Sequence, residues 1–212
     1  ESNPELRVAV LTGAGGTFCS GMDLKAFVNG EIPYIEGRGF AGLTEYRANK
    51  PIIAAVEGYA LAGGMELAIS CDMIVAASDS RFGIPEVKRG LAAGAGGLYK
   101  LPKQMPPRVA MELALTGDFM SAERAYELGL INQVVESGSA LTAAKEMAVR
   151  IAANGPLAVA ASIMVVTQSQ DWTMDESKEK QASFIDPVFS SEDAIEGAMA
   201  FAEKRAPNWK GK

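Results

Sequence analysis

Short apolar segments separated by glycine-rich turns constrain the fold of this chain more than any other feature. Residues 7–12, 52–56 and 73–77 are apolar, β-rich and about as long as buried strands. Gly13-Ala14-Gly15-Gly16 ends the first segment, and Gly63-Gly64 opens an apolar helix after the second. Strands that alternate with helices in this way are typical of an α/β fold with largely parallel strands.

Local signals place further elements along the chain. A short helix is expected from Asp23 to about residue 29, and residues 30–50 are expected to form a loop that leads into a helix. Pro106-Pro107 starts a helix that Gly117 ends. Ser121 caps another helix, and residues 131–135 form the last strand candidate.

The pattern changes after Gly138. Residues 139–154, 156–169, 174–185 and 191–204 have helical patterns, and Ser190 or Ser191 is the expected N-cap of the last helix. The apolar stripe of that helix needs a surface to cover, on this chain or on another subunit; it comprises Ile195, Ala198, Met199 and Ala202. We therefore predict a core in residues 1–138 and a helical oligomerisation segment in residues 139–212.

The composition excludes several kinds of site. The chain has no histidine, so Ser-His-Asp triads, Cys-His pairs and histidine-ligated metals are excluded, and we expect no metal. Its two cysteines are far apart in sequence and suit a reducing cytoplasm. A net charge of −6 gives no basic footprint for nucleic acid, and no apolar run is long enough for a membrane span. The last ten residues are basic, which suits either a solvated end or contact with a phosphorylated ligand.

Two glycine-rich turns invite a nucleotide-binding interpretation. Residues 13–18 and 94–99 begin like a dinucleotide fingerprint, but Phe18 and Tyr99 replace the third glycine. Neither turn carries the Lys-Ser/Thr pair of a phosphate-binding P-loop. We interpret both as turns that need glycine for the backbone alone.

Two glutamates are the strongest candidates for proton transfer. Glu66 lies in the first turn of the helix that Gly63-Gly64 opens, where free N–H groups could stabilise an oxyanion. Glu86 follows a strand-like segment and Pro85. Each alone is more simply a helix-dipole or loop carboxylate, but two carboxyls at one site can divide acid and base roles.

Six short motifs follow one another along the chain: Phe18-Cys19-Ser20-Gly21-Met22-Asp23-Leu24, Ala62-Gly63-Gly64-Met65-Glu66-Leu67, Cys71-Asp72, Phe82-Gly83-Ile84-Pro85-Glu86, Gly94-Ala95-Gly96-Gly97 and Leu115-Thr116-Gly117. In this order and spacing they resemble the crotonase superfamily of enoyl-CoA hydratases and isomerases, from about residue 7 to the end. The resemblance, closest to bacterial enoyl-CoA hydratases, implies a spiral of ββα units followed by a helical C-terminal segment.

The resemblance also implies a role for each site residue. The backbone N–H groups of Met22 and Gly63 would hold the thioester oxygen, and Glu66 and Glu86 would flank the reacting water. The coenzyme A part of the substrate would lie along Met22, Asp23, Leu24 and Lys25, with Phe201 and Lys204 of the C-terminal helix reaching it, in many relatives from a neighbouring subunit. No cofactor beyond this substrate is implied.

The family resemblance sets further expectations for the whole protein. A strand hairpin and a helix precede the position of Glu1 in the family, and we expect the natural protein to have them. The expected enzyme is a homotrimer or a dimer of trimers in cytoplasmic fatty-acid metabolism. The alternatives are an isomerase or a hydroxyacyl-CoA dehydratase of the same fold, or a non-catalytic acyl-CoA-binding paralogue. Retention of both Glu66 and Glu86 favours water chemistry.

Overall fold

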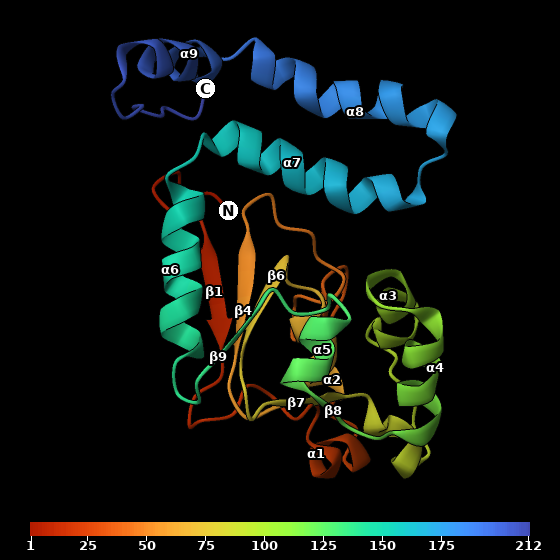
Figure 1. Cartoon of the computed structure of the whole chain (residues 1–212). Coiled ribbons are helices and arrows are strands. Elements are labelled where there is room, and N and C mark those ends of the chain that lie inside the picture. Colours follow the sequence, from red (N-terminus) through yellow and green to blue (C-terminus); the bar gives the residue numbers. More distant parts are fainter. The chain divides into compact units, whose positions relative to one another are not determined.

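The protein has strands and helices in alternation, followed by helices alone, as a computed structural model that describes residues 1–212 shows (Figure 1). The predicted α/β class with a helical C-terminal region is confirmed. Contacts within the chain define two compact units. The larger comprises residues 10–47 and 52–146, and the smaller comprises residues 1–9, 48–51 and 147–212.

A four-stranded sheet in the order β1-β4-β6-β9 forms the first layer of the α/β part. Its strands are β1 (Ala9–Thr12), β4 (Ile52–Val56), β6 (Met73–Ala77) and β9 (Gln133–Val135). The pairs β4-β6 and β6-β9 are parallel, with Ile53 opposite Met73 and Val75 opposite Gln133. β4 and β6 are buried over four of their five residues, which explains their nearly continuous apolar sequences.

A second sheet carries the segments that later meet at the site. It has the order β5-β7-β8, with β5 (Tyr59–Leu61) parallel to β7 (Arg81–Gly83) and β7 antiparallel to β8 (Met120–Ser121). A six-residue helix, α2 (Gly63–Ala68), follows β5, and a 3-10 helix, η1 (Pro85–Arg89), follows β7. Parallel pairing therefore delivers the starts of α2 and η1 to the same edge of this sheet.

The helices of the larger unit pack around these sheets. They are α1 (Leu24–Val28), α3 (Gly97–Gln104), α4 (Pro107–Thr116), α5 (Ala122–Glu127) and the first part of α6 (Ala140–Ala152). α3 packs on both α2 and α4 (Figure 1). The core joins β4, α2 and β6 to α3 and α4, and its largest fully buried side chains include Phe82, Met65 and Leu101.

The smaller unit is helical. Its helices are the end of α6, then α7 (Pro156–Gln168), the short 3-10 turn η2 (Ser169–Asp171), α8 (Met174–Phe189) and α9 (Glu192–Glu203). α8 starts with a capping box in which Thr173 and Glu176 bond each other's backbone, and Ser191 caps α9 as one of the two predicted candidates. α7 and α8 pack along one another (Figure 1).

One local prediction is wrong and one helix was not predicted. Residues 30–50 contain no helix but a hairpin of two short strands, β2 (Tyr34–Ile35) and β3 (Gly39–Phe40), followed by turns. Residues 94–96 form the predicted turn, and α3 begins directly after it at Gly97. The boundary predicted between residues 138 and 139 stays a prediction.

No single helix is long and apolar enough to cross a membrane. Residues 140–152 and 156–171 meet the length and composition criteria only when taken together, and they are bent by 111° at the break between them.

Candidate active site

The two predicted oxyanion donors come from segments that touch. Cys19 pairs with Ala60 in a parallel bridge, with the Cys19 N–H donating to Tyr59 O at 2.9 Å. Two residues later, Gly21 lies so close that a Cβ on it would stand 3.1 Å from the Gly63 nitrogen. Met22 follows directly, so its N–H and that of Gly63 belong to adjoining backbone segments.

Neither of these two N–H groups donates a hydrogen bond within the chain. Gly63 is the first residue of α2, where N–H groups have no partner inside the helix and carry partial positive charge. Ala62, just before it, has φ +51°, an uncommon value for an L-residue. Its N–H donates to Gly83 O at 2.9 Å, which ties the strained turn to β7.

Glu66 is a buried carboxyl held by the start of α3. Only 3% of the residue is exposed, and its Oε1 accepts the Gly97 N–H at 2.9 Å. Burial raises the pKa of Glu66 above its usual range, while the backbone N–H groups of Gly97 and Ala95 and the charge of Lys100 act in the opposite direction. The glycine-rich turn thus supplies donors for Glu66.

Glu86 has the opposite environment. It lies in the first turn of η1, and its Oε2 is buried with no hydrogen-bond partner. Burial raises its pKa to about 7, opposed by its own backbone N–H and reinforced by the charge of Glu66. The two glutamates are therefore close enough to interact electrostatically. The Glu66 carboxyl accepts a backbone hydrogen bond from Gly97, whereas Oε2 of Glu86 has no donor.

Lys25 and its neighbours form the exposed helix α1. Asp23 is its N-cap, and the Asp23 carboxylate accepts the N–H groups of Lys25 at 2.8 Å and Ala26 at 3.3 Å. Leu24 is 43% exposed and Lys25 is also exposed. The structure therefore gives Asp23 a capping role and leaves the Leu24 and Lys25 side chains open to a ligand.

Phe201 and Lys204 lie at the end of α9 in the smaller unit. Phe201 is 87% exposed, and Lys204 caps the helix with φ +56° and forms no ion pair within the chain. Arg205 and Lys210 differ, because they pair with Glu196 and with Glu192 respectively. Acidic residues of α9 therefore neutralise much of the basic charge of the chain end.

The C-terminal tail is fastened to the helices of the same unit. Asp193, only 5% exposed, accepts the backbone N–H groups of Lys210 at 2.7 Å and Gly211 at 2.9 Å. The Trp209 indole N–H donates to Ala153 O at 2.8 Å. These bonds fix the tail that follows Lys204.

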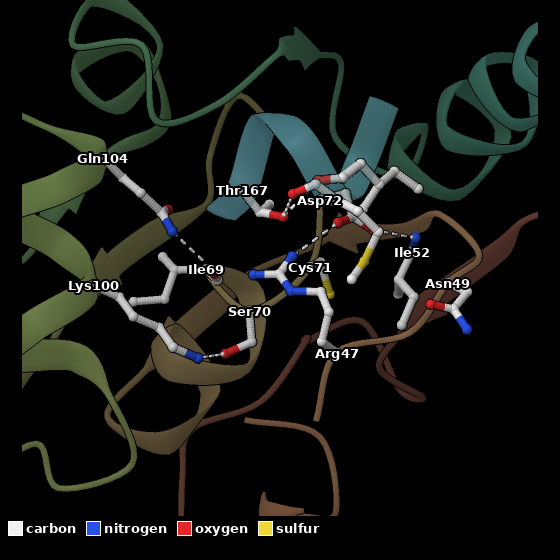
Figure 2. A network of polar contacts seen from close by, with 12 residues as sticks. Arg47, Asn49, Ile52, Ile69, Ser70, Cys71, Asp72, Lys100, Gln104 and Thr167 are labelled. Atoms are coloured by element: carbon white, nitrogen blue, oxygen red, sulfur yellow. Dashed lines mark hydrogen bonds and ion pairs between the residues drawn. The ribbon is translucent and has the colours of Figure 1, made fainter. Parts of the chain in front are cut away.

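A polar network beside Glu66 was not predicted from the sequence. Lys100 of α3 donates to the hydroxyl of Ser70, Gln104 donates to Ile69 O, and Arg47 pairs with Asp72 (Figure 2). The Cys71-Asp72 motif was noted, but no local pattern shows that Lys100 bonds to Ser70, thirty residues earlier.

A family model described as enoyl-CoA hydratase/isomerase matches residues 1–212. The chain belongs to this family. An enoyl-CoA hydratase from Mycobacterium marinum has 59% sequence identity and a TM-score of 0.97, covering 100% of this chain and 83% of that one. An enoyl-CoA hydratase from Mycobacterium tuberculosis H37Rv has 60% identity and a TM-score of 0.95, covering 98% and 82%. The crotonase fold inferred from the motifs is thereby confirmed.

Other relatives of this enoyl-CoA hydratase-type chain are named carnitinyl-CoA dehydratase or hydratase. A carnitinyl-CoA dehydratase from Proteus mirabilis is 43% identical over 218 residues, which is 99% of this chain and 84% of the relative. A carnitinyl-CoA hydratase structure from Mycobacterium avium has 46% identity and a TM-score of 0.76, covering 99% and 83%. Hydratases and dehydratases add and remove water, so these relatives support a hydro-lyase.

Proposed function

We propose that the protein hydrates the α,β double bond of an enoyl-CoA thioester and catalyses the reverse dehydration. The observation that carries this proposal is the pair of buried carboxyls with contrasting environments. Burial raises the pKa of both, but Glu66 accepts amide hydrogen bonds that oppose this shift, whereas Glu86 has a pKa raised to about 7 and an oxygen without a partner. Two carboxyls made different in this way can act as base and acid.

The proposed reaction starts with the thioester oxygen between the N–H groups of Met22 and Gly63. Glu66 takes a proton from water while the water oxygen bonds to C3, and the electron pair of the double bond moves toward the thioester as an enolate. The two N–H groups stabilise this negative charge, and removal of one such donor typically lowers the rate by about 10²–10³-fold.

Glu86 then completes the addition by donating its proton to C2. The product has gained one hydroxyl at C3 and one proton at C2, and Glu66 holds the proton taken from water while Glu86 is ionised. A proton passed from Glu66 to Glu86, directly or through solvent, restores the starting state. The electrostatic coupling between the two groups supports this exchange.

Ligand contacts and assembly are part of the same proposal. The exposed Lys25 and Lys204 suit the phosphates of coenzyme A, and the exposed Phe201 suits its adenine. We infer a homotrimer or a dimer of trimers in which α9 meets a neighbouring subunit.

A second substrate follows from the relatives named carnitinyl-CoA dehydratase or hydratase. A carnitinyl group ends in a quaternary ammonium, which aromatic rings and carboxylates bind. These relatives support carnitinyl-CoA as the alternative substrate.

The test is hydration of crotonyl-CoA and longer enoyl-CoAs by the purified protein, followed as loss of enoyl absorbance. Dehydration of carnitinyl-CoA is measured as a gain of enoyl absorbance. Glu66→Gln and Glu86→Gln are each expected to lower kcat by about 10²–10⁴-fold while the fold and substrate binding persist. The double variant is expected to lose less than the product of the single losses, because the two groups act together.

Glu146→Gln, an exposed glutamate on α6, is the matched control and should keep full activity. The proposal is wrong if hydration survives Glu86→Gln while isomerisation of a 3-enoyl-CoA is lost, since the protein would then be an isomerase. Binding of acyl-CoA without turnover of any of these thioesters would instead indicate a non-catalytic paralogue.

A further inference from the structure

Lys100 occupies an unusual place for a lysine, half-buried between three parts of the larger unit. It lies on α3, and its Nζ donates to the Ser70 hydroxyl at 2.7 Å and to the backbone oxygen of Thr44 (Figure 2 shows the bond to Ser70). Thr44 is itself buried, and its hydroxyl accepts the Phe40 N–H at 2.8 Å. Burying an ammonium group is costly unless it is well hydrogen-bonded, and Lys100 has two such acceptors.

Ser70 extends this contact to the backbone of Glu66. The Ser70 hydroxyl accepts from Lys100 and donates to the backbone oxygen of Glu66 at 2.6 Å. An unbroken chain of hydrogen bonds therefore runs from the lysine ammonium to the residue that carries the candidate base.

α3 also holds Glu66 at its side-chain end. The Gly97 N–H donates to the Glu66 carboxylate, and Gln104, one turn beyond Lys100, donates to Ile69 O at 3.0 Å. The start of α3 thus holds the carboxylate of Glu66, and the middle and end of α3 hold the backbone that follows it. Both the position and the direction of the Glu66 side chain depend on α3.

Charge acts in addition to these bonds. The charged or titratable groups that interact with Lys100 are Arg47, Glu66, Glu45, Cys71 and Tyr99, whose ring centroid lies 6.0 Å from the Lys100 Nζ. Burial and Arg47 lower the pKa of Lys100, whereas Glu66, Glu45 and Cys71 raise it. The Lys100 charge in turn lowers the pKa of Glu66, whose other charged neighbour is Glu86.

We propose that Lys100 is a positioning residue for the reaction, which holds Glu66 in place through Ser70. The inference rests on the proposed function, in which ionised Glu66 accepts a proton from water. Lys100 itself touches no reacting atom in this scheme. A lysine that only braced the fold would affect stability, but not the ionisation of Glu66.

The experiment compares kcat, KM and the pH dependence of crotonyl-CoA hydration in Lys100→Met, Lys100→Arg and Ser70→Ala. Lys100→Met is expected to lower kcat about 10–100-fold with little change in KM, because small misplacements of a catalytic group have effects of this size. Its loss of positive charge raises the pKa of Glu66, so the acid limb of kcat/KM moves to higher pH. Lys100→Arg should return the acid limb of kcat/KM to its wild-type pH. Ser70→Ala should lower kcat without moving the acid limb.

A measurement without substrate separates this inference from the function on which it rests. Carbon NMR titration of the Glu66 carboxyl, assigned with Glu66→Gln, should show its pKa raised in Lys100→Met but not in Lys145→Met, a change at an exposed lysine of α6. If the wild-type protein hydrates no thioester, the proposed function fails and the titration still decides the role of Lys100.

The inference is overturned if folded Lys100→Met keeps the wild-type kcat and the wild-type titration of Glu66, even when its melting temperature falls. Should Lys100→Met fail to fold, Lys100→Gln tests the charge alone, because it lacks the charge and keeps an N–H donor toward Ser70. The titration of Glu66 should still shift in this variant, and an unshifted titration overturns the inference.

Discussion

Glu86 illustrates at the scale of one residue how a carboxyl becomes an acid near neutral pH. Its side chain is half-buried, and its Oε2 contacts no donor. Glu66 has a more deeply buried side chain but accepts amide hydrogen bonds and lies near Lys100. The two carboxyls therefore differ in their hydrogen-bond donors and in the charge beside them, and not only in how deeply they are buried.

Activity should depend on the Glu86 proton. Because its pKa is raised from 4.5 to about 7, the free enzyme holds that proton in acidic solution and loses it as the pH rises through about 7. If Glu86 is the acid, kcat/KM for hydration should fall above this pH, and the residual activity of Glu86→Gln should lack that limb. A profile with the same alkaline limb in both proteins would contradict this assignment.

The same shift predicts a change in stability. A carboxyl whose pKa is raised by folding stabilises the folded state when protonated, and this stabilisation is lost as pH rises between 4.5 and about 7. Glu86→Gln should therefore raise the melting temperature at pH 8 but have little effect at pH 5. Solvent screening limits the gain to about 1 kcal/mol.

At the scale of elements, the junction of β5 and α2 depends on close approach of two backbones. A Cβ added to Gly64 would stand 2.0 Å from Cys19 O, so no side chain fits there without moving one segment. Cys19 belongs to the segment that leads to Met22. The junction thus sets the spacing of both oxyanion donors.

Gly64→Ala is expected to destabilise the protein by about 1–3 kcal/mol, the usual cost of overpacking, and to reduce hydration activity. Gly94→Ala is the matched control, since its Cβ would meet only Ala92 O at 3.8 Å, and it should stay within about 0.5 kcal/mol of wild type. Denaturant unfolding at equal protein concentration measures both. Equal stability of the two variants would show that the backbones can separate without cost.

Sequence patterns predicted the elements that have strong local signals. β4 and β6 are continuous apolar runs, and α4, α5 and α9 begin at Pro107, after Ser121 and after Ser191 as their capping residues indicate. α3 was missed because Gly97 and Pro102 both argue locally against a helix, and its contacts with α2 and α4 prevail. The hairpin of β2 and β3 has only two residues in each strand, too few to show a period.

The residues of the site also fall into those that the sequence predicts and those that it does not. Glu66, Glu86 and Gly63 were predicted from local chemistry as well as from the family motifs, and Met22 from the motifs alone. The structure brings the segment of Met22 against Gly63 and couples Glu66 with Glu86 electrostatically. The roles of Gly97 and Lys100 toward Glu66 could not be predicted, because residues thirty or more positions apart meet only in the folded chain.

At the scale of the whole molecule, α9 presents all four residues of its predicted stripe to solvent. Ile195 is 62% and Met199 50% exposed, and Ala198 and Ala202 are exposed as well. The buried side instead contains Asp193 and Ala200. Within the single chain the stripe is uncovered, and its cover by another subunit stays a prediction.

Light scattering of the natural protein should give the mass of a trimer or of a dimer of trimers. Ile195→Glu should shift the protein toward smaller species, because a charge would be buried in an apolar contact. Lys178→Glu, at an exposed position of α8, should leave the mass unchanged. A wild-type protein that is monomeric at all concentrations would contradict the assembly.

The contact of Gly21 with Gly63 has a consequence for how the enzyme forms. The segments that supply the oxyanion donors are about forty residues apart, and Glu86 and Gly97 come from two further turns of the chain. Contacts between such distant positions form only after the cost of closing the intervening loops has been met. During synthesis or refolding, helices can therefore be present well before any molecule is able to turn over substrate.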